Sequence, residues 1–125
     1  MKNLKPITLY NDKFLDLISW SMKVGGIALF PVCILRERYR DGNEYSVKQG
    51  KKILNHETIH FQQALELGVI LFYILYVLEW VIKLPFYGGK AYYNISFERE
   101  AYDNDDDLTY LGVRKRYNWV KRILK

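Results

Sequence analysis

The chain contains only two histidines, and they lie four residues apart around a glutamate in the run HETIH, residues 56–60. On a helix, residues i and i+4 lie on one face, so His56 and His60 can reach one metal ion while Glu57 stands beside it. Zinc accepts imidazole nitrogens, and a catalytic zinc keeps a position for water beside three protein ligands. The spacing therefore predicts a metal site at which Glu57 takes a proton from a water molecule.

The third protein ligand must come from elsewhere in the chain, and it cannot be a histidine because none is left. The segment SFEREAY, residues 96–102, offers two carboxylates, Glu98 and Glu100. On a helix, at about 100° per residue, these side chains project roughly 200° apart, so only one of them can face the metal. Residue spacing alone leaves both candidates open.

HETIH followed by FEREAY resembles the gluzincin metallopeptidases, in which HExxH supplies two histidines and a later helix supplies a glutamate. In several of these families the glutamate opens an E-x-x-A-D pattern, which Glu98-x-x-Ala101-Tyr102 matches up to its last residue. HETIHFQQ is also similar to small bacterial zincin domains. The resemblance covers about fifteen residues. It implies Zn²⁺ held by His56, His60 and Glu98, and hydrolysis of a peptide or protein substrate with Glu57 as general base.

The chain departs from this pattern at Tyr102, where the gluzincins usually carry an aspartate that braces a metal-binding histidine. Either Asp103, Glu100 or another group is expected to take over that role, or the metal site is weaker. Gln63 lies about one turn beyond His60 and is expected to support the site by a hydrogen bond.

Peptide hydrolysis also needs a hydrogen-bond donor for the oxyanion that develops on the substrate carbonyl. Four candidates lie near the third ligand in the sequence, and nothing singles one of them out: Tyr92, Tyr93, Arg99 and Tyr102. The resemblance further implies that an edge strand from residues 27–39 binds an extended peptide by backbone pairing.

Two helices must position the metal ligands. The first is expected to begin between Ser46 and Gly50 and to run through HETIH toward Lys83, with a kink at Gly68 and a stop at Pro85 and Gly88-Gly89. The second is expected to begin with Ser96 as N-cap and to end near Gly112. Between residues 103 and 107 its outer face is acidic and is expected to be solvated.

The remaining elements are shorter. A helix is predicted over residues 12–23, and one or two extended segments over 27–39, with Pro31 at an edge or bulge. Residues 40–44 indicate a turn. The sequence thus predicts one domain over residues 1–125, a helix-dominated α+β fold of the zincin type with a small sheet and a basic C-terminal helix at about residues 113–125.

Two apolar runs, Val24–Leu35 and Leu67–Leu78, are each twelve residues long and fall short of the roughly 20 residues of a spanning helix. We therefore expect both to be buried in the core, with membrane contact as the alternative. Glu79 is expected to pair with Lys83 or to face solvent. Glu66 is expected to be solvated. The polar start of the chain contains no recognisable secretory signal, which favours a cytoplasmic protein.

The net charge of +5 is concentrated at the C-terminal end. Arg114–Lys125 carries six basic residues and no acidic one, whereas the preceding 113 residues hold 13 basic and 14 acidic groups. With its hydrophobic spacing, this tail is a candidate for contact with an anionic membrane surface, while nucleic acid is not expected as a partner. It also supports an alternative function, a non-catalytic, metal-stabilised binding or assembly protein with a protein partner. The lone Cys33 excludes a cysteine-rich zinc module.

Overall fold

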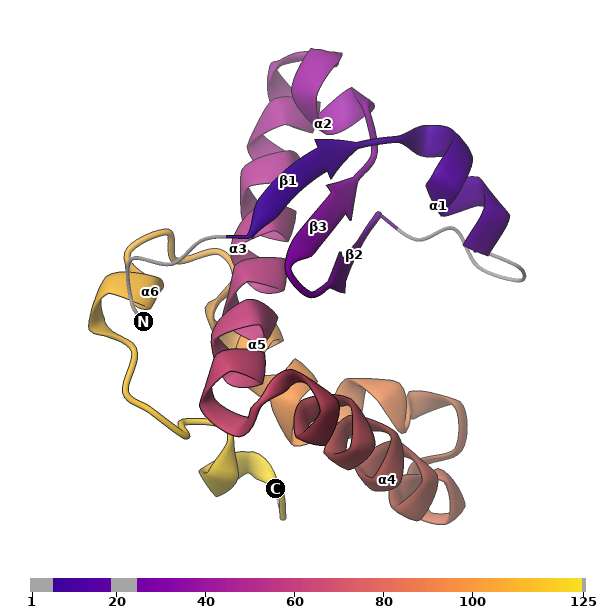
Figure 1. Ribbon diagram of the computed structural model, residues 1–125, viewed down its shortest axis with the longest axis vertical. Coiled ribbons are helices and arrows are strands. Elements are labelled where there is room, and N and C mark those ends of the chain that lie inside the picture. Colours follow the sequence, from indigo (N-terminus) through magenta and orange to yellow (C-terminus); the bar gives the residue numbers. More distant parts are fainter. Residues whose placement is uncertain (1–5, 19–24, 125) are drawn as a thin grey trace.

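The computed structural model describes residues 6–18 and 25–124. Within these ranges helices dominate and one three-stranded sheet is formed, so the α+β class is confirmed. The long helix α3 (Glu44–Leu67) organises the molecule. The sheet lies beside its N-terminal half, and α4 (Val69–Tyr87) lies at its other end (Figure 1).

The sheet has the order β1-β3-β2, so β3 (Val32–Leu35) is its central strand. β1 (Ile7–Tyr10) pairs with β3 in parallel, and β2 (Gly26–Leu29) pairs with it antiparallel, which leaves β2 at an edge. The two extended segments expected for this region are confirmed. The expected burial is confirmed for Cys33, Ile34 and Leu35 of β3, whereas Gly26 and Ile27 of β2 are only half-buried. β1 was not predicted, although the alternation in ITLY is typical of a strand.

The helix α1 (Asp12–Ile18) confirms the first part of the helix predicted over 12–23, whose remainder lies outside the described residues. A short helix, α2 (Arg38–Asp41), overlaps the predicted turn. α3 begins two residues earlier than predicted, because the side chain of Asn43 caps it and accepts a hydrogen bond from the Ser46 N–H at 2.8 Å.

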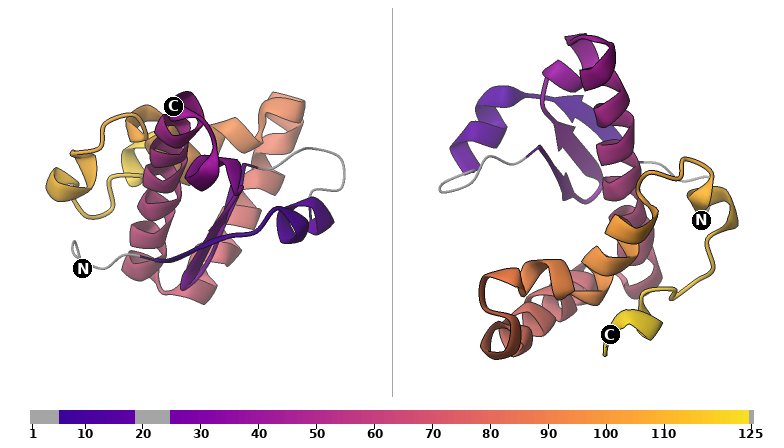
Figure 2. Two further views of the ribbon diagram at one scale, coloured as in Figure 1. Left: turned by 90° about the horizontal axis from the view of Figure 1, so that it is seen from above. Right: turned by 180° about the vertical axis from the view of Figure 1, so that it is seen from behind.

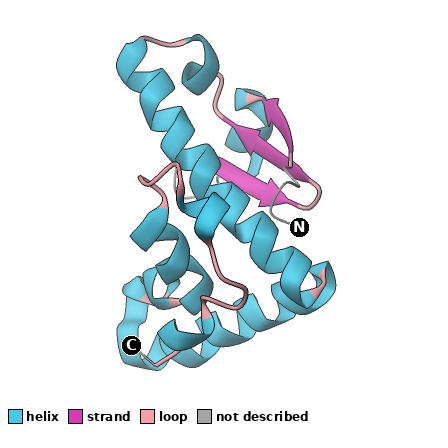
Figure 3. Ribbon diagram, turned by 90° about the vertical axis from the view of Figure 1, so that its left-hand side faces the viewer, coloured by secondary structure: helices cyan, strands magenta, loops and turns pink. Residues whose placement is uncertain are grey.

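The predicted kink at Gly68 is a complete break between two helices. Gly68 has φ +82°, a conformation that favours glycine, and α4 leaves α3 at a steep angle there (Figure 3). The predicted stop is confirmed at Gly88, which has φ +56° and caps α4, but not at Pro85, since α4 continues to Tyr87. Pro85 lies inside the last turn, where it removes the hydrogen bond to the carbonyl four residues earlier without ending the helix.

The predicted burial of the second apolar run is wrong. Among the residues of α4 only Phe72 and Lys83 are buried, and most of its apolar side chains face solvent. Together with the turn that follows it, α4 forms a helical stretch, Val69–Lys90, that is long and apolar enough to cross a membrane, and only 6% of its most apolar 18 residues are buried. The reason is positional: one side of α4 contacts the rest of the chain, while the other sides have no neighbour among the described residues (Figures 1 and 2).

After α4, two single turns of 3-10 helix, η1 (Gly88–Lys90) and η2 (Tyr92–Asn94), lead into α5 (Ser96–Asn104). α5 is shorter than predicted, and Ser96 is its first residue rather than its cap. Glu79 of α4 binds this end of α5, because its carboxylate accepts hydrogen bonds from the Ser96 N–H and hydroxyl, each at 2.6 Å. The expected Glu79–Lys83 ion pair is confirmed at 2.6 Å.

The C-terminal segment contains α6 (Tyr110–Val113) and one 3-10 turn, η3 (Val120–Arg122), so the predicted helix over 113–125 is wrong in the described residues. The buried Trp119 holds this segment against α5, with the Trp119 and Phe97 rings 4.6 Å apart. These rings belong to a core cluster that joins α3, α4, α5 and the C-terminal segment: Ala64, Phe72, Ile95, Phe97 and Trp119.

Candidate metal centre

The face of α3 that turns toward α5 carries both histidines, and α5 places Glu98 between them. Nε2 of His56 lies 2.9 Å from Oε1 of Glu98, Nε2 of His60 lies 3.1 Å from the same oxygen, and the two nitrogens are 3.2 Å apart. A tetrahedral ion with metal–ligand distances of about 2.0–2.1 Å has ligand–ligand edges of about 3.3–3.4 Å. The three buried side chains therefore form a group that fits a metal ion.

The electrostatics of this group favour a positive charge. Burial alone lowers the pKa of His60, but the charge and hydrogen bond of Glu98 outweigh it and raise that pKa to about 9. Burial likewise opposes the charged form of Glu98, yet the two histidines hold its pKa well below the usual range. A buried carboxylate that stays ionised beside two imidazoles attracts cations, whether protons or metal ions.

Glu100, the alternative ligand, points away from the histidines into a buried ion network. Arg114 donates to Glu100 through Nε at 2.5 Å and to Glu66 through Nη1 and Nη2, each at 2.9 Å. Burial disfavours ionised Glu100, but the hydrogen bonds from Arg114 and Tyr110 lower its pKa below the ordinary value. The expectation that Glu66 is solvated is wrong, because its side chain is fully buried against Arg114.

Both histidines are braced on their second nitrogen. Nδ1 of His60 lies 2.8 Å from Oε1 of Gln63, which confirms the expected support. Nδ1 of His56 lies 3.1 Å from Oδ2 of Asp105, a residue of the acidic run that the sequence predicts to be solvated. That expectation is wrong for Asp105, which is only 4% exposed. Asp105, just beyond the end of α5, therefore takes the bracing role that the gluzincin pattern gives to an aspartate at the position of Tyr102.

The loop that carries Asp105 is attached to α3 by the residue next to the first histidine. Nδ2 of Asn55 donates to the backbone carbonyls of Asn104, Asp105 and Asp107 at 3.3, 2.9 and 3.0 Å. Lys52, one turn earlier on α3, lies 3.9 Å from the other carboxylate oxygen of Asp105. The only signal in the sequence was the acidic run itself, whose members do not reveal which one turns inward.

Replacing Asp105 with asparagine is expected to weaken metal binding by about 10- to 100-fold, because a histidine ligand loses the anionic partner that fixes its orientation. Competition with a fluorescent chelator measures the affinity. The matched control is Asp103→Asn, since the Asp103 side chain is 61% exposed and bound to Arg122 rather than to a histidine. Equal affinities of the two variants would contradict the bracing role.

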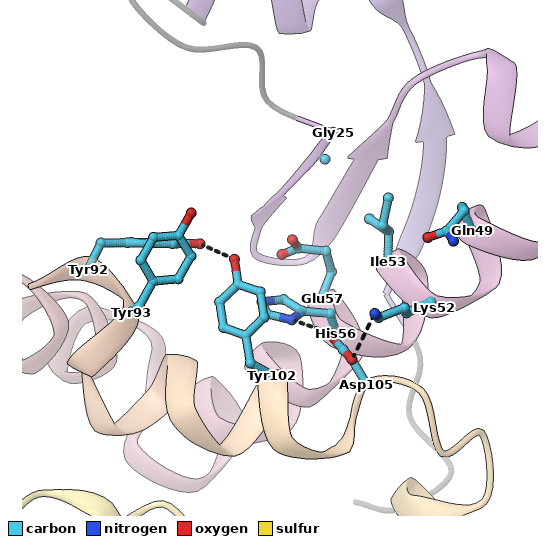
Figure 4. A pocket seen from close by; sticks show the side chains of 11 residues that line it. Gly25, Gln49, Lys52, Ile53, His56, Glu57, Tyr92, Tyr93, Tyr102 and Asp105 are labelled. Atoms are coloured by element: carbon cyan, nitrogen blue, oxygen red, sulfur yellow. Dashed lines mark hydrogen bonds and ion pairs between the residues drawn. The ribbon is translucent and has the colours of Figure 1, made fainter. Parts of the chain in front are cut away.

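A pocket of about 390 Å³ opens beside His56. The carboxylate of Glu57 faces this opening, with the hydroxyl groups of Tyr92 and Tyr102 opposite and Gly25 of the chain entering β2 at its rim (Figure 4). Burial raises the pKa of Glu57 above its ordinary value, and Glu98 adds to this effect against the opposing histidines. A carboxylate so perturbed is a stronger base than one in water.

Three of the four candidate oxyanion donors, all tyrosines, line this pocket: Tyr92, Tyr93 and Tyr102. The ring of Tyr102 contacts that of His56, with centroids 4.4 Å apart, and its hydroxyl lies 3.3 Å from that of Tyr92. Arg99 is excluded from this role, because its guanidinium binds Asn94 and the Arg122 carbonyl.

Tyr76, which no motif in the sequence indicates, reaches the site from α4. Its hydroxyl donates to the second carboxylate oxygen of Glu98 at 2.5 Å, so Glu98 keeps Oε1 directed at the histidines. The arrangement as a whole can hold a metal ion and can bring a basic carboxylate to the same pocket. Comparisons with protein-family models, curated proteins and solved structures find no match for this chain.

Proposed function

We propose that this protein is a zinc-dependent peptidase with the ligand set of the gluzincins. The observation that carries the proposal is the position of Glu57, whose carboxylate opens into a pocket beside the group formed by His56, His60 and Glu98. A purely structural zinc site is closed by four protein ligands and has no use for a neighbouring base. Three donors and an adjacent free carboxylate are typical of hydrolytic sites.

The donor set favours zinc among the common metals. Imidazole nitrogens suit zinc, whereas magnesium and calcium prefer oxygen ligands throughout. Two histidines and a glutamate form one of the known catalytic zinc sets. When bound, zinc would supply Lewis-acid chemistry, polarising the substrate carbonyl and lowering the pKa of water toward about 7.

The chain's own residues would handle the protons. Glu57 accepts a proton as the water oxygen forms its bond to the substrate carbonyl carbon, and returns it to the amine nitrogen as the C–N bond breaks. Tyr102 is the candidate donor to the developing oxyanion, because its ring contacts that of His56, with centroids 4.4 Å apart, and its hydroxyl faces the pocket opposite Glu57.

The edge strand β2 supports a peptide as the substrate. Among the described strands it pairs only with β3, so its outer backbone groups are available to an extended chain. Gly25 and Gly26 line the pocket at the entrance of this strand. A peptide paired with β2 would pass the carboxylate of Glu57.

Metal analysis of the purified protein tests the proposal. We expect one zinc ion per chain in the wild type and in Glu57→Gln, and loss of zinc in Glu98→Gln and His60→Ala, because only the last two variants remove a ligand. Glu57→Gln is the matched control, since it alters a carboxylate of the same site that binds no metal. A wild-type protein without zinc, or Glu98→Gln with full zinc content, would refute the site.

A further inference from the structure

The outward surface of α4 is apolar over most of the helix circumference. Its exposed side chains include Ile70, Ile74, Val77 and Val81, each at least half exposed. They recur at i, i+4, i+7 and i+11 and so form a continuous stripe along the helix. A water-soluble protein rarely presents an apolar surface of this length to solvent.

The two charged residues of α4 both lie on its inward side. Glu79 and Lys83 pair with each other, and both bind the segment that leads into α5: Glu79 accepts from Ser96, and Lys83 donates to the Asn94 carbonyl. Tyr76, on the same side, binds Glu98. The outward surface of α4 therefore carries no charge. Its inward side forms hydrogen bonds with α5 and with the segment that leads into it.

Three amphipathic aromatic residues mark the border between these two sides. Tyr73, Trp80 and Tyr87 are 38%, 41% and 40% exposed. They are spaced by seven residues, so they form one line parallel to the helix axis. Tyrosine and tryptophan favour the level at which hydrocarbon meets water. In a spanning helix such residues gather at the two ends, whereas a line along the axis is expected for a helix that lies in the membrane plane.

The surroundings of α4 complement an anionic lipid surface. Lys90 follows its C-terminal end, and the C-terminal segment with η3 lies, like α4, at the lower end of the molecule in Figure 1. That segment exposes Lys115 and Lys121 together with apolar Leu124, and it contains no acidic residue. Basic side chains beside an immersed apolar surface add electrostatic attraction to anionic lipids.

We propose that α4 lies in the plane of a lipid bilayer, with its outward surface among the acyl chains and the metal centre on the aqueous side. A spanning orientation is disfavoured, because the inward contacts would carry Glu98, Arg99 and their neighbours into hydrocarbon. This membrane contact is independent of the proposed peptidase activity. Membrane contact is expected for the basic tail, and the proposal adds the apolar helix α4 as a second contact.

Co-sedimentation of the purified full-length protein with vesicles tests the inference. We expect binding to phosphatidylcholine vesicles and stronger binding when phosphatidylglycerol is included. The double variant Ile74→Glu/Val81→Glu is expected to bind at least about tenfold more weakly, because two apolar side chains can no longer enter the acyl region. Both residues are 50% exposed or more, so circular dichroism should show an unchanged fold.

The matched control is Leu17→Glu/Leu108→Glu, which adds the same charge at two exposed leucines outside α4. We expect it to bind vesicles nearly as well as the wild type. If vesicle binding weakened equally in both double variants, the loss would be due to net charge alone, and the role of α4 would be overturned. A wild type that binds no vesicles but forms a dimer that Ile74→Glu/Val81→Glu dissociates would also overturn it, since a second copy would then cover α4.

The orientation of α4 relative to the membrane is tested with one fluorescent label. Val81→Cys, in a Cys33→Ser background, carries an environment-sensitive fluorophore. Vesicle addition is expected to shift the emission to the blue, and alkaline carbonate is expected to release the protein from the membrane. Resistance to carbonate extraction would indicate a spanning helix and would contradict the in-plane orientation.

Discussion

Glu57→Gln is expected to lower kcat/KM for peptide hydrolysis by about 10²–10⁴-fold while zinc remains bound. Glutamine keeps the shape of the side chain but cannot accept the proton of the attacking water. Glu57 faces the pocket and ligates nothing in the group of His56, His60 and Glu98, so the loss should appear in kcat rather than in metal content. Hydrolysis of a fluorogenic peptide library, with zinc measured on the same samples, gives both values.

The control for this substitution is Glu44→Gln, an exposed glutamate at the start of the same helix, which should leave kcat/KM unchanged. Equal activity of Glu57→Gln and the wild type would exclude Glu57 as the base. A wild type that binds zinc but cleaves no peptide in the library would favour the alternative function, a metal-stabilised binding or assembly protein.

Arg114→Met is expected to lower the free energy of unfolding by about 3–5 kcal/mol, because it leaves two buried carboxylates without a cation. The side chains of Glu66 and Glu100 are fully buried against Arg114, and Gln63 connects Glu100 to His60. Urea denaturation followed by circular dichroism measures the change. Arg114 belongs to the basic C-terminal run, yet its side chain is buried and pairs with two buried carboxylates instead of facing solvent.

Lys115→Met provides the comparison, since the neighbouring lysine is exposed and its removal should change stability by less than about 0.5 kcal/mol. Adding Glu66→Gln and Glu100→Gln to Arg114→Met is expected to recover part of the lost stability, because the unpaired charges disappear. Similar unfolding midpoints for Arg114→Met and Lys115→Met would show that the ion network contributes little.

Several predictions that depend on a single helix or strand are confirmed by the structure. HETIH lies on a helix with both histidines on its inward face, because helical periodicity alone sets that relation. Gly68 interrupts the helices as a residue with positive φ. The strands β2 and β3 follow from β-favouring residues between turns. Each of these features is encoded by neighbours a few residues apart.

Features that depend on contacts between distant residues were not predictable in the same way. Helical spacing allowed either Glu98 or Glu100 as third ligand, and the packing of α5 on α3, with Arg114 holding Glu100, turns Glu98 toward the histidines. Asp105 braces His56 only because Asn55 holds its loop, 50 residues away in the sequence. The periodicity of a helix or strand gives no information about contacts between residues so far apart in the sequence.

The sequence by itself determined the donors, namely two imidazoles at helical spacing, a carboxylate beside them and a second acidic segment for the third ligand. Tertiary structure decided which carboxylate faces the donors, which aspartate braces them and which side of α4 stays exposed. The physical reason is the range of the interactions. Helix periodicity acts over one or two turns, whereas burial and ion pairing depend on which elements the fold brings together.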